Sequence, residues 1–398
     1  MFNQEIAQSV RHHGRNQIVC LSSTRWDFLW QRPQQIMSRL SRTYDVLYVD
    51  PALPVYALET DELTAGAGLL TRRLRKVHDS LLVFSPQMIA KHSRPDQDPE
   101  SLHAMNAGLL ARQLGAILTL LRWQTPLFWA YDPQACLVLN LLPRRGVVYD
   151  CVDCFPAFSW ADPLTAQWDR EMMAKADVVL TSALALYQER NIDGKATFLV
   201  PNAADYAHFA QAGNLTAEAP ELAGVRQPRL GFIGAVYEWV DLDLLATVAE
   251  AQPDWQLVMI GPAQHGLVLP ERPNIHWLGP RDYRLLPMYL QGLSVMLIPF
   301  HRNEVTDHTN PIKMWEYLAA GKPIVATMLP EIPEIPGVIW QCETPEEFIE
   351  GCASALGLMQ DPVRSEEISC RARAVARANS WDERCKQIKD ILAAHFGF

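Results

Sequence analysis

A lysine and a glutamate three residues apart open an apolar helix in the stretch "TNPIKMWEYLAAGKPIVAT", residues 309–327. Asn310 and Pro311 predict an N-cap followed by a proline at the first helical position, where a missing N–H costs nothing. Lys313 then lies in the first turn, where its charge opposes the helix dipole unless an anion is bound nearby. A phosphate would resolve that conflict, and Glu316, one turn further, could accept hydrogen bonds from a ribose diol.

This pattern has two interpretations, a nucleoside diphosphate site or a surface ion pair at the i,i+3 spacing common on helices. A glycine turn favours the first. Gly234, in "GFIGAVYEW", follows an apolar strand and precedes a helix, so backbone amides there could approach a pyrophosphate. The predicted donor-binding set therefore adds Gly234, its neighbours Ala235 and Tyr237, and Thr309 beside the helix start.

Short apolar runs alternate with helical stretches along the chain, in two successive series. The first series of predicted strands covers 17–23, 44–50, 80–86, 126–132, 146–153, 177–183 and 196–202. The second covers 229–235, 255–262, 274–279, 294–300, the Ile-Val-Ala run after Pro323, and 337–342. Buried strands separated by helices predict a parallel sheet, so two series predict two doubly wound, Rossmann-like domains. Ligands bind such sheets at the carboxyl ends of the strands, and the cleft between two domains is the expected site.

The segment 200–228, rich in Ala, Pro, Gly and Asn, has weak periodicity and marks the predicted domain boundary. We assign 1–205 to an N-terminal acceptor-binding domain and 206–380 to a donor-binding domain. A helix over 381–398 follows Ser380, a good N-cap. The segment 106–123 reads as an amphipathic core helix, and neither a membrane span nor an N-terminal signal peptide is expected.

The net charge of −10 over 398 residues is unevenly distributed. Residues 1–145 hold 16 Lys+Arg against 12 Asp+Glu, whereas the remainder holds 19 against 33. A mildly basic N-terminal part on an acidic chain indicates different partners for the two halves, and the absence of basic runs argues against nucleic acid. Among eight cysteines, Cys151 and Cys154 form one C-x-x-C, which is either a redox or zinc motif or two small residues at a strand end.

The stretch from Glu316 to Val325 resembles the E-A-x-A-x-G-x-P-V-V segment of GT-B glycosyltransferases, especially glycosyltransferase family 4. "LVPNAADYAHF" resembles the interdomain signature of that family, and "SWDERCKQIKDIL" resembles its closing helix, which crosses back to the N-terminal domain. "VVYDCVDCFPAF" and "STRWDFLWQRPQQ" are similar to a subgroup from bacterial exopolysaccharide and teichuronic acid clusters. The resemblance implies a GT-B architecture, with two Rossmann-like domains facing across a cleft, and a ribose contact for Glu316.

Two positions depart from the family pattern. His308, with Asp307 beside it, stands where the family carries the first Glu of an E-x7-E pair. The turn "GAVYEWVD" lacks the Arg and Lys that usually contact the diphosphate, so Lys313 is the candidate substitute. His308 could reach the transferred sugar or a phosphate oxygen, or it could be a loop histidine facing water. No metal-binding carboxylate cluster is apparent, so we expect no metal and no cofactor beyond the nucleotide-diphosphate sugar as co-substrate.

Candidate catalytic carboxylates follow predicted strands of the N-terminal domain. Asp132 and Asp153 lie at strand ends, where a general base for an inverting reaction would be needed, and Asp153 is the preferred candidate. Asp150, within its strand, more naturally forms a structural pair. A retaining enzyme needs no such base, because the leaving phosphate can take the proton, and the family resemblance favours retention.

The loop after the first strand is the candidate acceptor site. It offers aromatic faces for sugar rings and guanidinium groups for phosphate, from Arg25, Trp26, Trp30 and Arg32. The alternative is a loop anchored in the core by its tryptophans, with solvated arginines. The basic N-terminal part fits an anionic membrane surface, which a lipid-linked acceptor would require.

The sequence therefore predicts a cytoplasmic glycosyltransferase, acting at the inner face of the plasma membrane. It would use a UDP- or GDP-type sugar and a glycan or lipid-linked acceptor in surface polysaccharide synthesis. The alternatives are a nucleotide-sugar epimerase on the same fold and a non-catalytic glycan- or nucleotide-binding scaffold. The sequence leaves open the sugar, the base, the acceptor, the linkage and the oligomeric state.

Overall fold

The computed structural model describes residues 14–55, 71–90 and 98–398, to which the structural statements below refer. The N-terminal stretch 1–17, for which no signal peptide is expected, lies mostly outside the described residues. The chain divides into two compact units. The first unit comprises Met1–Ser182, Leu186–Val200 and Cys385–Phe398, and the second comprises Ala183–Ala185 and Pro201–Arg384. The main division thus falls after Val200, five residues before the predicted boundary, and the last residues group with the first unit.

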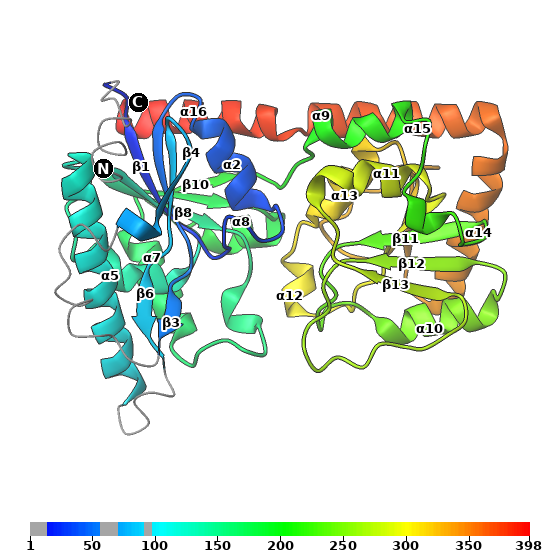
Figure 1. Ribbon diagram of the computed structural model, residues 1–398, viewed down its shortest axis with the longest axis horizontal. Coiled ribbons are helices and arrows are strands. Elements are labelled where there is room, and N and C mark those ends of the chain that lie inside the picture. Colours follow the sequence, from blue (N-terminus) through cyan, green and yellow to red (C-terminus); the bar gives the residue numbers. More distant parts are fainter. Residues whose placement is uncertain (1–13, 56–70, 91–97) are drawn as a thin grey trace. The chain divides into compact units, whose positions relative to one another are not determined.

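The first unit is built on a sheet with the strand order β10-β9-β8-β7-β1-β2-β5-β4 (Figure 1). Its strands are β1 (Gln17–Leu21), β2 (Asp45–Val49), β4 (Leu74–His78), β5 (Leu81–Phe84), β7 (Leu127–Ala130), β8 (Gly146–Cys151), β9 (Val178–Thr181) and β10 (Ala196–Leu199). The strands pair in parallel except β4, an edge strand antiparallel to β5. The chain order reverses between β1 and β7, which places the loops after these strands at the switch point where such sheets bind ligands.

The sequence patterns missed three short strands of this unit. β3 (Leu53–Val55) and β6 (Gln87–Ile89) form a two-stranded parallel sheet of their own. β4 has one buried residue followed by four exposed ones, so its sequence contains no apolar run that would predict a buried strand. Each of the seven predicted strands is present but is two or three residues shorter than predicted.

The second unit repeats the plan with the all-parallel order β13-β12-β11-β14-β15-β16. Its strands are β11 (Arg229–Ile233), β12 (Gln256–Ile260), β13 (Ile275–Gly279), β14 (Val295–Ile298), β15 (Ile324–Thr327) and β16 (Ile339–Cys342). The switch point lies between β11 and β14, so the Gly234 turn and the loop that precedes Lys313 leave the sheet side by side. The predicted fold class, doubly wound α/β in both halves, is therefore confirmed.

Helices connect the strands in each unit. Those of the first unit are α2 (Arg32–Leu40), α5 (Pro99–Leu121), α6 (Cys136–Leu139), α7 (Thr165–Lys175) and α8 (Leu184–Arg190). Those of the second unit are α9 (Tyr206–Phe209), α10 (Leu242–Ala251), α11 (Leu286–Gln291), α12 (Glu304–Asp307), α13 (Ile312–Ala319), α14 (Pro345–Gln360) and α15 (Pro362–Ala378), and α16 (Trp381–Phe396) begins there. Local capping defines several starts: the side chains of Asp98, Asp241, Thr344 and Asp361 accept hydrogen bonds from the first turns of α5, α10, α14 and α15. The predicted cap Ser380 accepts from the Glu383 N–H at 3.3 Å.

Helix α5 contains the stretch predicted as a core helix. By length and composition it is the one helix among the described residues that could cross a membrane, and 44% of the tested window is buried inside the structure. Leu114, Ile117 and Leu118 of this helix are almost fully buried. Because the core helix of a globular unit meets the same criteria, α5 carries no argument for a membrane span.

Candidate active site

The turn after β11 packs backbone against backbone with the turn after β12. Gly234 donates its N–H to the Ile260 carbonyl at 2.8 Å. Gly261, with φ +145°, could not carry a Cβ, because that atom would collide with the Gly234 carbonyl. A Cβ on Gly234 would lie 2.7 Å from Cε of Lys313. The turn predicted to face a pyrophosphate is therefore in contact with the predicted phosphate-binding lysine.

Helix α13 begins one residue later than predicted. Its first residue is Ile312 and its N-cap is Pro311, so the assignment of Asn310 as N-cap and Pro311 as first helical residue is wrong. The Asn310 side chain is used elsewhere, because its Oδ1 accepts from the indole N–H of Trp315 at 2.8 Å. Lys313 is consequently the second residue of the helix, still in the first turn where the backbone N–H groups have no intrahelical acceptor.

The Lys313 ammonium lies over two aromatic rings. It is 4.9 Å from the ring centroid of Phe300 and 5.3 Å from that of Phe232. Burial lowers the pKa of Lys313 to about 8, against the opposing effect of Glu316. These contacts replace the surface ion pair that was the alternative interpretation, since the described residues show no ion pair between Lys313 and Glu316. A bound anion would supply the counter-charge that the ammonium lacks.

Glu316 lies one turn further along α13 and is also poorly solvated. Burial raises the pKa of Glu316 to about 8; Lys313 opposes this shift and the nearby Asp205 carboxylate adds to it. Two neighbouring side chains of opposite charge, each held away from its ordinary pKa without forming an ion pair, are typical of a ligand site. The arrangement suits an anion at Lys313 and a hydroxyl group at Glu316.

Tyr317 is a residue of this site that sequence reasoning missed. Its hydroxyl accepts from the Ile233 N–H at 2.8 Å and donates to the Ile233 carbonyl at 3.1 Å, although 84 residues separate the two in sequence. Ile233 immediately precedes the Gly234 turn, so Tyr317 fastens α13 to the end of β11. The sequence could not indicate this role, because a tyrosine inside an apolar helix is equally typical of the hydrophobic core.

We expect Tyr317→Phe to destabilise the protein by about 1–3 kcal/mol, because it leaves the buried Ile233 N–H without its acceptor. The free energy of unfolding, measured by denaturant titration, provides the test. Tyr283→Phe is the matched control: its hydroxyl makes a longer bond, 3.3 Å to Asp205, on a half-buried side chain. Equal losses for the two variants would contradict the special role of Tyr317.

The loop before α13 holds the residues that depart from the family pattern. His308 ends α12, and its Nδ1 lies 2.6 Å from the Glu304 carbonyl, which places the proton of a neutral ring on Nδ1. Thr309 donates its hydroxyl to the Val305 carbonyl at 2.7 Å. Both side chains are therefore bonded to α12, and their predicted contacts with donor sugar or phosphate stay predictions.

The remaining predicted donor residues lie just after Gly234. Ala235 and Tyr237 are both half-buried, and the Tyr237 ring stacks on Trp239 with centroids 4.9 Å apart and an angle of 7°. The second unit thus brings Gly234, Lys313 and Glu316 together around the start of α13. Ala235 and Tyr237 lie close to Gly234 in the chain, and their predicted contacts with the donor stay predictions.

The two candidate carboxylates of the first unit follow adjacent strands, β7 and β8. Asp132 caps a short 3-10 turn, accepting the Gln134 N–H at 2.8 Å, and burial raises its pKa. Burial raises the pKa of Asp153 to about 7, against the opposing charge of Arg32. A carboxyl group that titrates near neutrality can exchange a proton with a hydroxyl group, so Asp153 keeps its place as the preferred candidate.

The raised pKa of Asp153 has a consequence for stability. The folded state holds the Asp153 proton up to about pH 7, whereas the unfolded chain releases it near pH 4, so this group lowers stability as pH rises between these values. We expect Asp153→Asn to raise the unfolding midpoint at pH 8 and to leave it almost unchanged at pH 4. Thermal unfolding from pH 4 to 8 would measure this, with the exposed Asp193→Asn as control. A constant difference at all pH values would contradict the shift.

Two of the residues predicted to bind the acceptor are buried and contact other side chains of the first unit. The Arg32 guanidinium is 2% exposed and pairs with Asp150, Nη2 to Oδ1 at 2.9 Å and Nε to both oxygens at 3.0 and 3.1 Å. It also donates to the Val200 carbonyl at 2.8 Å. The Arg32 guanidinium is thus held in a buried ion pair, and Asp150 is the structural partner that its strand position suggested. The contact of Arg32 with an acceptor stays a prediction.

Trp26 is the other buried residue of the predicted acceptor set. It is 5% exposed and packs edge-on against Tyr48, with centroids 5.0 Å apart, so its face is not available to a sugar ring. Trp30 is half-buried against Trp26, and Arg25 is exposed. The alternative of a loop anchored in the core by tryptophan holds for Trp26, while acceptor contacts of Arg25 and Trp30 stay predictions.

The C-x-x-C motif contains two buried cysteines, and neither is in a disulfide. Cys151 is in β8, and its S–H contacts the Asp153 carbonyl at 3.8 Å. Burial raises the pKa of Cys151 to about 12, which makes this thiol a poor nucleophile. Among the described residues no group of three or more His, Cys, Asp or Glu side chains could hold a metal ion.

Comparisons with known proteins agree with this architecture. Residues 227–357, most of the second unit, match the family model described as "Glycosyl transferases group 1". Sucrose-phosphate synthase from Thermosynechococcus elongatus superposes with a TM-score of 0.70 at 13% identity, covering 96% of this chain and all of that one. Anabaena HepE, solved with UDP and glucose, gives 0.63 at 15% identity over 95% and 99% of the chains. The second unit is therefore similar to the group 1 glycosyl transferases, and the chain has the GT-B fold of the solved glycosyltransferases.

A further comparison finds a relative whose name is more specific. The chain is 29% identical over 282 residues to Bacillus subtilis (strain 168) TuaH, whose name describes a teichuronic acid biosynthesis glycosyltransferase. The match covers 65% of this chain and 70% of that protein. The recognised resemblance to the teichuronic acid subgroup is therefore confirmed.

Proposed function

We propose that this protein transfers a sugar from a nucleoside diphosphate sugar to a glycan or lipid-linked acceptor in bacterial surface polysaccharide synthesis. The observation that carries the proposal is the Lys313 ammonium, which lies against the Gly234 turn at the start of α13 and has no ion pair within the part of the chain that the structure describes. UDP in the HepE structure and UDP-2-fluoroglucose in an Escherichia coli structure of the same fold support a nucleotide sugar. The name of TuaH supports a surface polysaccharide.

The chemistry needs stabilisation of a diphosphate leaving group. In our proposal the free N–H groups at the start of α13 and the Lys313 ammonium supply it. Binding of the diphosphate would raise the lowered pKa of Lys313, because an anion then favours the charged form. Glu316 would accept a hydrogen bond from the ribose. This scheme uses only groups of the chain, with no metal and no cofactor.

We propose retention of configuration, with the leaving phosphate accepting the proton of the acceptor hydroxyl. The family resemblance supports this assignment. Asp153 then orients or polarises the acceptor, whereas in an inverting enzyme it would be the general base. The anomeric configuration of the first-formed product, read by NMR coupling constants, distinguishes the two. We place the acceptor in the N-terminal unit and the reaction at the cytoplasmic face of the membrane.

The test is thermal unfolding in the presence of UDP, GDP, ADP and their sugars, because binding to the native state raises the midpoint by mass action. We expect one nucleotide to raise it, and Lys313→Ala and Glu316→Ala to abolish that rise. Glu346→Gln, on an exposed first turn of α14, is the matched control. No rise with any nucleotide, from a folded protein, would favour the non-catalytic scaffold instead.

A further inference from the structure

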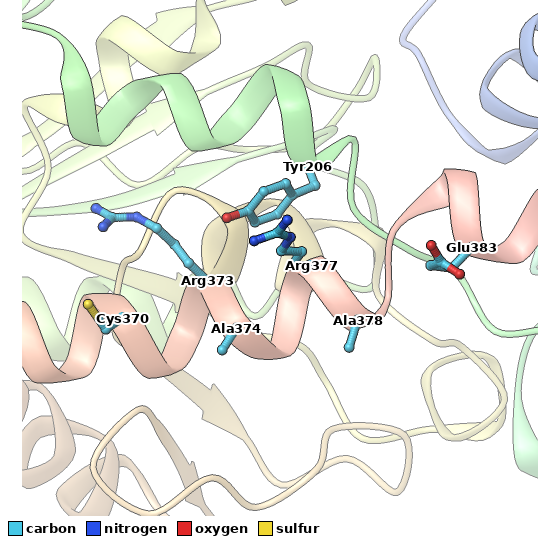
Figure 2. A pocket seen from close by; sticks show the side chains of 7 residues that line it. All are labelled: Tyr206, Cys370, Arg373, Ala374, Arg377, Ala378 and Glu383. Atoms are coloured by element: carbon cyan, nitrogen blue, oxygen red, sulfur yellow. The ribbon is translucent and has the colours of Figure 1, made fainter.

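An open groove of about 740 Å³ lies on the second unit, between α9 and the end of α15. Figure 2 shows Tyr206 reaching from α9 toward Arg373 and Arg377 of α15, with Cys370 one turn before Arg373 and Glu383 further along on α16. The groove borders the C-terminal end of α13, because Arg373 packs against Gly321, whereas Lys313 is near the start of that helix. It is therefore separate from the candidate donor site.

Two arginines of the groove lack acceptors. Arg373 and Arg377 make no hydrogen bond or ion pair within the described part of the chain, and Nε of Arg373 is buried without a partner. At the i,i+4 spacing their like charges face the same side of α15, which is unfavourable without an anion. Guanidinium groups that have no acceptor within the described chain can bind the oxygens of an anion that enters the groove.

The Arg373 guanidinium packs against the backbone of two glycines, Gly213 and Gly321. A Cβ on Gly321, where φ is +76°, would lie 2.9 Å from both Nε and Nη2, and one on Gly213 would collide with the same guanidinium. Two carboxylates lie near the groove, Glu383 in its lining and Glu366 bonded to Cys370, but neither forms an ion pair with Arg373 among the described residues. The neighbouring Lys322 has a pKa lowered to about 8 by burial and then by Arg373. Three cationic side chains, Arg373, Arg377 and Lys322, therefore lie at this end of the second unit without an ion pair among the described residues.

We propose that this groove binds a phosphate group carried on a polar organic molecule. Guanidinium groups form paired hydrogen bonds with phosphate oxygens, and a dianion would offset both charges. The Tyr206 hydroxyl supplies a further donor, and its ring offers a face to the organic part. The volume is within the range of small-molecule sites and exceeds what a phosphate ion alone requires. A free sugar phosphate and a phosphate-bearing lipid head group share this chemistry.

Cys370 is a reporter for the test. It is the exposed thiol among eight cysteines, and the other seven are buried, so a neutral maleimide should label Cys370 first. We expect glucose 6-phosphate and inorganic phosphate to slow this labelling saturably, with the sugar phosphate acting at lower concentration. Cys370→Ser, which should not be labelled, identifies the site of reaction. If phosphatidic acid vesicles protect Cys370 and soluble phosphates do not, the ligand is a lipid head group.

Substitutions decide between binding and non-specific effects. Arg377→Ala, at an exposed position, is expected to raise the half-protecting concentration about tenfold, through loss of a charge-assisted hydrogen bond. Arg371→Ala removes an exposed arginine of the same helix outside the groove and should leave that concentration unchanged. Lys313→Met should also leave it unchanged, which separates this site from the donor site. The proposal is overturned if no phosphate probe protects Cys370, or if Arg377→Ala and Arg371→Ala behave alike.

Discussion

Replacing Lys313 with methionine is expected to weaken binding of a nucleoside diphosphate about 10- to 100-fold. The ammonium lies beside the Gly234 turn and forms no ion pair with a carboxylate of the described residues, so its hydrogen bonds are available to a phosphate. A hydrogen bond to a charged group contributes about 1.5–3 kcal/mol, which corresponds to that range of affinity. Methionine keeps an apolar stem over the rings of Phe232 and Phe300, so the packing should survive.

Titration calorimetry with the nucleotide that binds the native protein would measure this effect. The loss should be large for the nucleoside diphosphate and small for the nucleoside, since only the former carries the phosphates. Without nucleotide, Lys313→Met should unfold at the same or a higher temperature, because it removes a poorly solvated charge. Arg364→Met, an exposed charge on α15, is the control. Equal losses for nucleoside and diphosphate would remove Lys313 from the phosphate site.

Replacing Arg32 with methionine is expected to destabilise the protein by about 3–5 kcal/mol, because it leaves a buried carboxylate without its cation. Asp150 is fully buried, and its two oxygens receive Nε and Nη2 of Arg32. The double variant Arg32→Met with Asp150→Asn should be more stable than the single variant, since no uncompensated charge then remains. Arg32→Met should also raise the pKa of Asp153 further, because Arg32 opposes that shift.

Denaturant unfolding would compare these variants with Arg75→Met, which breaks an exposed pair with Asp27 in the same unit. That pair is largely solvated, so its loss should cost about 0–1 kcal/mol. A cost for Arg32→Met no greater than that for Arg75→Met would show that Asp150 is neutralised in some other way.

Local patterns in the sequence determined the framework of this protein. The apolar runs around Val19 and Leu297 predicted strands because strands buried on both faces need apolar side chains on both faces. The glycine after β11 and the lysine at the start of α13 indicated a diphosphate site from residue types and spacing alone. The alternation of strand and helix then defined two doubly wound units.

Only the tertiary structure decided what individual polar side chains do. The partner of Arg32 lies 118 residues away and that of Tyr317 lies 84 residues away, so no local pattern could reveal either. Asn310 had the chemistry of an N-cap, but Trp315 occupies its carbonyl oxygen. The sequence does not distinguish Arg32 from Arg373, yet the first forms a buried ion pair with Asp150 and the second lines a groove and has no acceptor among the described residues. Burial and long-range partners determine this difference.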